Sequence, residues 1–260
     1  MEARLLEYDK KKNKCSFILK DTNAAFANVL RRNIINKVPV MAIEEVEFRK
    51  NSSVLYDEIV AHRLGLVPLA TDLKTYDLPA ECSCKGKLCA KCRVKLKLKV
   101  KGPCTVYASD LKSRDPKIKP VYPKMPIVKL LKGQSLELEA SAILGEGKEH
   151  IKWSPGLAYY KYKPIIEIGK YKDASIIAKV CPVDVFDVKE GKLSINKDNY
   201  LKCHLCGACQ DIDPGIKLNE SDSEIVFYLE SFGQLSCKDI LFKAMDIFDK
   251  QLSELQKKIK

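Results

Sequence analysis

Cysteines supply most of the side chains in this sequence that could do chemistry, since its 260 residues include 11 cysteines and only three histidines. The sharpest pattern is a C-x2-C-x2-C run made of Cys203, Cys206 and Cys209. Such close spacing lets one loop wrap around a cluster of iron and sulfide, with backbone N–H groups aimed at the sulfurs. Gly207 within the run permits that tight approach of the backbone. We therefore predict an iron–sulfur cluster on these three thiolates.

The position at which a fourth cysteine would follow this run indicates how many clusters to expect. In bacterial ferredoxins the run continues as x3-C-P, and that last cysteine serves a second cluster. Here Asp213 precedes Pro214 at that position, so a second cluster lacks its ligands. Cys181 precedes a proline upstream, at a distance from Cys203 that suits a strand, a turn and a return strand. We predict one cluster, with Cys181 as its fourth ligand.

The type of cluster depends on Cys181. With this ligand the product is a 4Fe-4S cluster, and without it a 3Fe-4S cluster is the natural product. Zinc on the four thiolates is one alternative, although the run is tighter than in usual zinc knuckles, and a site without metal is the other. We interpret His204, which lies inside the run, as a solvated loop residue because the thiolates already satisfy the pattern.

A second cysteine group has the spacing C-x-C-x4-C-x2-C and comprises Cys82, Cys84, Cys89 and Cys92. Four thiolates so close together can hold one tetrahedral zinc ion that pins a loop. The alternatives are a pair of disulfides or an empty, oxidised loop. We favour zinc because four cysteines within so few residues rarely occur by chance in a cytosolic chain. The isolated cysteines are interpreted as small buried hydrophobic residues, namely Cys15, Cys104 and Cys237.

The elements at the two ends of the chain present large apolar faces. The sequence predicts a hairpin over 4–19, and N-cap residues at 21–23 then start a helix that Val38-Pro39 ends. Near the other end, a strand over 225–230 precedes a helix that begins with a near capping box, Ser236 and Asp239. The apolar face of the first helix consists of Phe26, Val29, Leu30 and Ile34. Arg31 and Arg32 point away from this face. The last helix has a stripe typical of a core or a partner interface: Leu241, Met245, Phe248, Leu252, Leu255 and Ile259.

Between the two ends the sequence predicts strands and loops. Apolar residues alternate with lysines over 94–101 and with glutamates over 136–142, which is the pattern of half-buried strands. A further strand is expected over 41–50, and a short helix over 56–64 with Gly65 as a left-handed C-cap. The prolines between 116 and 126 predict an irregular loop.

Charge and hydropathy narrow the class of protein. The sequence has 46 Lys and Arg against 34 Asp and Glu, a net charge of +12, which makes nucleic acid the first candidate for an acidic partner. The lysines are spread along the chain and form no stripe laced with aromatic residues, which favours an ordinary charged surface. The N-terminus lacks a signal-peptide h-region, and no apolar run approaches the roughly 18–20 residues of a membrane span. We therefore expect a cytoplasmic protein.

Two motifs within 23–72 carry a family resemblance. The segments NVLRR (28–32) and VPVMAIE (38–44) together resemble the dimerisation signature of alpha-like RNA polymerase subunits. The segment DEIVAHRLGLVPL (57–69) is similar to the companion motif of the D subunits of archaeal DNA-directed RNA polymerases and of the eukaryotic third-largest subunit. The overall layout extends the resemblance over essentially the whole chain. The eukaryotic relative also has a zinc-binding cysteine loop after this motif, with a different spacing.

The resemblance implies an α+β protein with three parts. A discontinuous alpha-like dimerisation domain takes residues 1–40 and 223–260, a mostly β insert domain takes 41–165, and a ferredoxin-like iron–sulfur domain takes 166–222. The first and last helices pack against the small alpha-like L subunit, and the pair then recruits the N and P subunits and the second-largest subunit. Arg31 and Arg32 face the larger subunits. The subunit is expected to contact DNA only indirectly, through the assembled polymerase, and to bind no membrane.

Three functions of different classes compete. The first is a non-catalytic assembly subunit of DNA-directed RNA polymerase, since the chain offers no nucleophile–base pair, phosphate loop or aspartate triplet. Enzyme activity then belongs to the complex alone. The second is a ferredoxin-like electron-transfer protein, which leaves 23–72 unexplained, and the third is a nucleic-acid binder, which only charge supports. We favour the first, in which the cluster either staples a small domain or senses oxygen or redox state.

Overall fold

A computed structural model describes residues 1–259. The chain forms two compact units, each of them a mixture of helices and strands. Unit 1 comprises 1–8, 15–29 and 159–228, and unit 2 comprises 9–14, 30–158 and the residues from 229 onward. The mixture of α and β elements that the sequence indicates is therefore present. Within the described part of the chain, no helix is both long enough and apolar enough to span a membrane.

Unit 1 contains a four-stranded sheet in the order β1-β2-β12-β9. β1 (Glu2–Asp9) and β2 (Lys14–Lys20) form the predicted N-terminal hairpin, and β12 (Ile216–Ser231) includes the strand predicted over 225–230. β9 (Gly156–Ile168) was not predicted. Phe17 of β2 stacks on Phe227 of β12, with ring centroids 5.1 Å apart. These rings are both buried, so the hairpin is held to the sheet by aromatic packing as well as by strand pairing.

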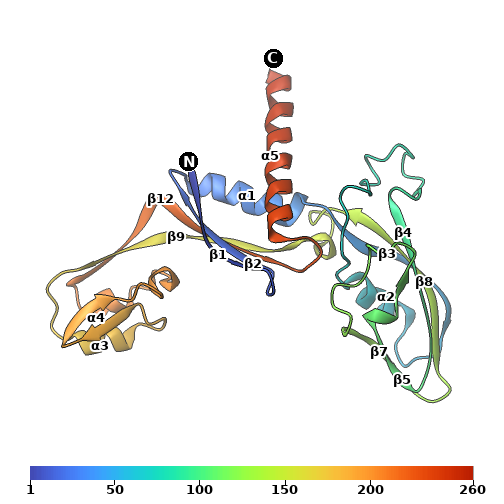
Figure 1. The fold of residues 1–260 in the computed structure, drawn as a ribbon, viewed down its shortest axis with the longest axis horizontal. Helices are drawn as coiled ribbons and strands as arrows, with labels where there is room; N and C mark the ends of the chain where they lie inside the picture. Colours follow the sequence, from blue (N-terminus) through green and yellow to red (C-terminus); the bar gives the residue numbers. More distant parts are fainter. Residues whose placement is uncertain (260) are drawn as a thin grey trace. The chain divides into compact units, whose positions relative to one another are not determined.

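The rest of unit 1 is a small lobe inserted between β9 and β12 (Figure 1, orange). Its antiparallel hairpin of β10 and β11 lies between Cys181 and Cys203, as the distance between these cysteines predicted. The elements of the lobe are α3 (Ala174–Val180), β10 (Phe186–Lys189), β11 (Lys192–Ile195), the short helical turn η3 (Tyr200–Lys202) and α4 (Ala208–Ile212). Its buried core has few side chains: Ala174, Ile177, Val185, Phe186, Leu193, Cys203, Cys209 and Ile216. So small a core stabilises a fold only slightly without a cross-link or a metal.

Unit 2 is built on a second four-stranded sheet, in the order β3-β8-β4-β6; Figure 1 labels β3, β8 and β4. Its strands are β3 (Val40–Asn51), β8 (Ser135–Gly145), β4 (Arg93–Lys101) and β6 (Lys112–Ser113). The predicted alternation in β4 is confirmed, because Val94, Leu96 and Leu98 are buried in the core. On the other face, Lys97 lies opposite Glu139 of β8, and Lys99 opposite Glu137. The sheet therefore has one apolar and one charged face.

A short helix and a two-stranded ribbon complete the core of unit 2. The helix is α2 (Asp57–Gly65), and the ribbon pairs β5 (Cys104–Tyr107) with β7 (Pro126–Leu130). Val60 and Leu64 of α2 are fully buried against the sheet. The predicted left-handed C-cap at Gly65 is wrong. Leu66 closes the helix at φ −88°, because its N–H reaches the carbonyls of His62 and Leu64 without a left-handed residue.

Both terminal helices begin with the predicted caps. α1 (Ala24–Lys37) starts after Asn23, whose side-chain oxygen accepts the N–H of Phe26 at 3.0 Å. α5 (Cys237–Ile259) starts after Ser236, whose Oγ accepts the N–H of Asp239 at 3.1 Å. Each side-chain oxygen satisfies a backbone donor that has no partner within its helix.

Candidate metal centres and partner surface

The loop between α2 and β4 brings four thiols together. The Sγ atoms of Cys82, Cys84, Cys89 and Cys92 all lie within 4.8 Å of one another. The Cys82–Cys89 and Cys84–Cys92 pairs are each separated by 3.6 Å, and the Cys89–Cys92 pair by 4.0 Å. Four sulfurs around one zinc ion, at Zn–S distances of about 2.3 Å, form a tetrahedron with edges of roughly 3.8 Å. The four thiols are free, and their arrangement fits one tetrahedral ion.

Tight turns place these thiols within a few residues of chain. The N–H of Lys85 donates to the carbonyl of Cys82 at 3.0 Å, and that of Cys92 donates to the carbonyl of Cys89 at 3.1 Å. Between these turns Lys85, Gly86 and Leu88 have φ values of 51°, 81° and 52°. Left-handed residues reverse the chain sharply, so the loop folds back on itself and its sulfurs converge.

The thiols of this loop differ in acidity. The backbone N–H of Cys89 beside the sulfur of Cys84 lowers the pKa of Cys84 to about 6. Burial raises the pKa of Cys92 to about 12. Because the thiolate is the ligand, a metal bound here must displace protons from the more buried thiols.

A second set of cysteines lines one small hollow in the lobe of unit 1. These are Cys181, Cys203, Cys206 and Cys209, the four ligands that spacing predicts. Cys181 caps the C-terminus of α3, and Cys203 and Cys206 precede α4, which contains Cys209. The other walls are mostly apolar: Ile166, Val183, Val185, Phe186, Ala208 and Leu218. Thiolates in an apolar enclosure are suitable donors for an iron–sulfur cluster.

Backbone N–H groups point at the sulfurs of this second set. The N–H of Val185 donates to Sγ of Cys181 at 3.4 Å. Burial raises the pKa of Cys203 and Cys209, while backbone N–H groups beside each sulfur act in the opposite direction. Gly207, at φ 80°, makes the turn into α4 that the tight run requires. His204 is exposed, in agreement with its interpretation as a solvated loop residue.

Asp213 stands where a ferredoxin would have a cysteine before Pro214, and its carboxylate links two backbone segments. Its two carboxylate oxygens accept the N–H groups of Lys172 at 2.8 Å and Gly215 at 2.9 Å. These bonds hold the pKa of Asp213 below its usual range. Counting back from Cys181 with ferredoxin spacing places the other ligands of a second cluster at Ala174 and Ile177, which belong to the lobe's core, and at Tyr171, which packs against it. The positions that would hold the ligands of a second cluster are therefore taken by apolar side chains and by the hydrogen-bonded carboxylate of Asp213.

The residues predicted for a partner interface on α1 differ in exposure. Leu30 and Ile34 are 6% and 0% exposed and belong to this chain's own core. The others retain some accessible surface: Phe26, Val29 and Arg31 are half-buried and Arg32 is exposed. Helical periodicity could not separate these groups, because a face covered by the same chain has the same pattern as one covered by a partner.

The predicted stripe of α5 is largely accessible. Only Cys237, Ile240 and Ala244, all near its start, are buried, and every residue over 251–259 is exposed. Leu241 and Phe248 are half-buried. The exposed apolar side chains are Phe242, Met245, Leu252, Leu255 and Ile259. Phe242 was missed because it lies beside the stripe and not within it.

Comparison with known proteins identifies the family. Residues 42–156 match the family model described as the RNA polymerase Rpb3/RpoA insert domain. The chain is 42% identical over 259 residues to DNA-directed RNA polymerase subunit Rpo3 of Methanosarcina mazei, covering 98% of this chain and 97% of that protein. It is 38% identical over 270 residues to subunit Rpo3 of Pyrococcus furiosus, covering 99% and 98%. The chain belongs to the archaeal Rpo3 family.

The alignments with the Rpo3 relatives extend over nearly the whole chain, so they include both cysteine groups and both terminal helices. The resemblance to alpha-like polymerase subunits is confirmed at the level of the family. The electron-transfer alternative accounts for the lobe alone, and these matches do not support it. The relatives' names specify a polymerase subunit and no cofactor, so the metal assignments depend on the geometry of the thiols.

Proposed function

We propose that this chain is the non-catalytic assembly subunit of an archaeal DNA-directed RNA polymerase, the component also called the D subunit. It pairs with the small alpha-like L subunit, and the pair recruits the N and P subunits and the second-largest subunit. Nucleotide polymerisation belongs to the complex, and this chain contributes no catalytic residue. Its place is the cytoplasm, and it meets DNA only through the complex. Membership of the Rpo3 family supports this assignment.

The main support for the proposed pairing is the exposed C-terminal segment of α5, residues 251–259. The 251–259 segment is exposed on every face but includes Leu252, Leu255 and Ile259, which are 48%, 54% and 77% exposed. A short helical segment without packing is marginally stable in water. Burying such side chains fully contributes roughly 1.5–3 kcal/mol each. Burial of this stripe by a partner helix would therefore stabilise the complex by several kcal/mol. Such burial also explains why an exposed helix has an apolar stripe.

The proposed domain layout follows the family resemblance. Residues 1–40 and 223–260 form the dimerisation domain, 41–165 the insert domain, and 166–222 the ferredoxin-like domain. The family model, which matches 42–156, falls within the proposed insert. The lobe with α3, α4 and the β10–β11 hairpin falls within the proposed ferredoxin-like domain.

Each thiol set has a proposed metal. Cys82, Cys84, Cys89 and Cys92 hold one zinc ion, and the sulfur spacing supports that assignment. Cys203, Cys206, Cys209 and Cys181 hold one 4Fe-4S cluster, supported by the N–H bond to Cys181 and the apolar hollow. Each metal supplies thiolate cross-links that stabilise a segment with little apolar core of its own.

Co-expression with the L subunit tests the proposed pairing. We expect a stable heterodimer in size-exclusion chromatography, and we expect Leu252→Asp with Leu255→Asp to abolish it. The matched control is Gln251→Asp with Ser253→Asp, which changes equally exposed positions on the same turns and should leave the heterodimer intact. A chain that stays monomeric with its partner, or two double variants with equal effects, would contradict the proposal.

The cluster assignment has a separate test. Protein purified without oxygen should be brown, with broad absorption in the visible range and roughly four iron atoms per chain. Iron near three atoms would remove Cys181 from the ligand set. A colourless, iron-free protein with two zinc ions would overturn the cluster.

A further inference from the structure

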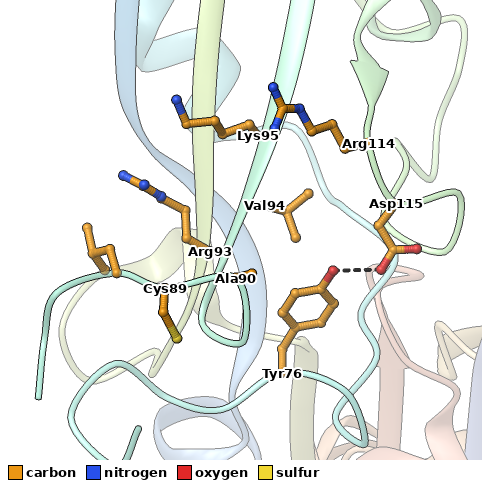
Figure 2. Close-up of a pocket in the computed structure, with 9 residues that line it drawn as sticks. Tyr76, Cys89, Ala90, Arg93, Val94, Lys95, Arg114 and Asp115 are labelled. Atoms are coloured by element: carbon orange, nitrogen blue, oxygen red, sulfur yellow. Dashed lines mark hydrogen bonds between the residues drawn. The ribbon is translucent and has the colours of Figure 1, made fainter. Parts of the chain in front are cut away.

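Beside the Cys82–Cys92 loop, unit 2 has a hollow of about 320 Å³ that the functions above do not use (Figure 2). Three cationic side chains line it: Arg93, Lys95 and Arg114. Figure 2 shows Lys95 and Arg114 at one end of the hollow, with Tyr76 and Cys89 at the other. A concave site with several like charges is where an oppositely charged ligand gains most.

Strand pairing explains why the three cations gather. Arg93 and Lys95 occupy alternate positions of β4 and so lie on the same face of the sheet. Arg114 directly follows the neighbouring strand β6, and its N–H donates to the carbonyl of Lys95 at 3.3 Å. Strand pairing therefore places the three residues next to one another on the same side of the sheet.

The neighbouring carboxylates leave two of these cations without an ion pair. Lys95 donates to Glu139, which is only 9% exposed. Asp115 accepts the hydroxyl of Tyr76 at 2.6 Å and the N–H of Lys117 at 2.9 Å. Among residues 1–259, no carboxylate lies within 4.0 Å of the guanidinium of Arg93 or Arg114, although the charge of Arg114 acts on Glu139 from farther away. Both guanidinium groups keep donors for a ligand.

We infer that this hollow docks an acidic segment of another protein, whose carboxylates bind the guanidinium groups of Arg93 and Arg114. A guanidinium donates two parallel hydrogen bonds to one carboxylate, which gives the contact both strength and orientation. Leu88 and Ala90 lie on the wall and offer apolar contact to a residue beside the acidic ones. This partner is additional to the one that covers α5, and the inference does not depend on that pairing.

Two other roles for these cations fit less well. Nucleic acid is bound by aromatic platforms or long basic tracks, whereas Tyr76, the aromatic side chain of this hollow, is 7% exposed and bonded to Asp115. Neutralising the thiolate loop does not require these arginines, because the loop has its own exposed lysines, Lys85, Lys87 and Lys91. An acidic peptide is therefore the ligand that the hollow matches.

The test is a titration of the full-length chain, purified with its metals, against a fluorescein-labelled oligoglutamate peptide, followed by fluorescence anisotropy. We expect saturable binding that weakens about tenfold or more in Arg93→Ala with Arg114→Ala. The matched control is Lys124→Ala with Lys132→Ala, which removes the same charge from exposed positions outside the hollow. Binding by this control should change less than about twofold.

A lysine variant keeps the test interpretable if alanine disturbs the loop. Arg93→Lys with Arg114→Lys retains the charge but loses the two-pronged donors, so we expect an intermediate loss at unchanged zinc content and melting temperature. Equal losses in the arginine and control variants would show non-specific attraction and overturn the inference. So would tighter, arginine-dependent binding of polyuridylate, or no saturable binding at all.

Discussion

Several carboxylates of this chain hold loops by accepting hydrogen bonds. Asp213 does so in the lobe. Asp72, at the start of the segment that leads to the thiol loop, accepts the N–H of Lys74 at 2.9 Å, the hydroxyl of Thr75 at 2.8 Å and the ammonium of Lys117 at 2.7 Å. Lys117 belongs to the proline-rich segment, so Asp72 ties two irregular stretches of unit 2 together. The bond from Lys117, followed by the other donors, holds the pKa of Asp72 well below its usual range.

Asp72→Asn should destabilise unit 2 in a pH-dependent way. A depressed folded-state pKa contributes stability above the unfolded-state pKa of about 3.9, and that contribution disappears as the pH falls through the folded value. The melting temperature of the variant should therefore lie below that of the parent at pH 7, by an amount that is constant down to about pH 5 and shrinks under more acidic conditions. Thermal melts over this range measure the gap, and a gap that widens on acidification would contradict the assignment.

Cys84→Ser should abolish binding of the zinc ion proposed for the thiol loop. The thiol of Cys84 has a pKa of about 6, so it is the ligand most readily available as a thiolate near neutral pH. Zinc content measured by mass spectrometry should fall from one ion per chain to well below half. Cys104 was predicted to be buried but is half-buried, as Cys84 is, and it lies outside both thiol sets, so Cys104→Ser is the matched control. Unchanged zinc in Cys84→Ser would remove the proposed site.

Elements were predictable where the pattern that stabilises them is local. β4 and β8 alternate apolar and charged residues, and the caps of α1 and α5 are next to the helices they start. β9 was missed because its burial does not alternate cleanly and because its partner in the sheet, β12, is distant in sequence. The thiols of 82–92 and of 203–209 could be grouped from spacing because each run is short, whereas Cys181 joins the second set only through the β10–β11 hairpin. The hollow could not be predicted, because Arg114 reaches it only through the pairing of β6 with β4.

The cap of α5 gives a prediction for the element as a whole. Ser236→Ala removes the acceptor for the N–H of Asp239 and should cost about 1 kcal/mol of stability. Because α5 carries the proposed partner surface, the affinity for the L subunit should fall by severalfold as well. Ser253→Ala, on the exposed part of the same helix, is the control and should leave both unchanged or slightly improved. Calorimetry and a binding titration measure the two effects, and a fall in stability with no change in affinity would separate the cap from the interface.

At the scale of the whole molecule, each unit has its own hydrophobic core and its own thiol set. The core of unit 2 is large and includes residues from two sheets and α2. The core of the lobe in unit 1 has few apolar side chains and includes two of the cysteines. Loss of metal should therefore affect the two units unequally, because only the lobe lacks enough buried apolar surface to compensate.

Replacement of Cys203, Cys206 and Cys209 by serine tests this inequality. Iron should be lost, and amide hydrogen exchange should accelerate over 166–222, because the remaining core is too small to keep the lobe folded. Exchange over 42–156 and the zinc content should not change, since that region has a separate core and separate ligands. If the cluster is a staple, chelators should produce the same local unfolding in the parent chain, whereas a redox sensor should respond to oxidants while the lobe stays folded. Assembly with the L, N and P subunits should be impaired in either case, so full assembly of the triple variant would refute both roles.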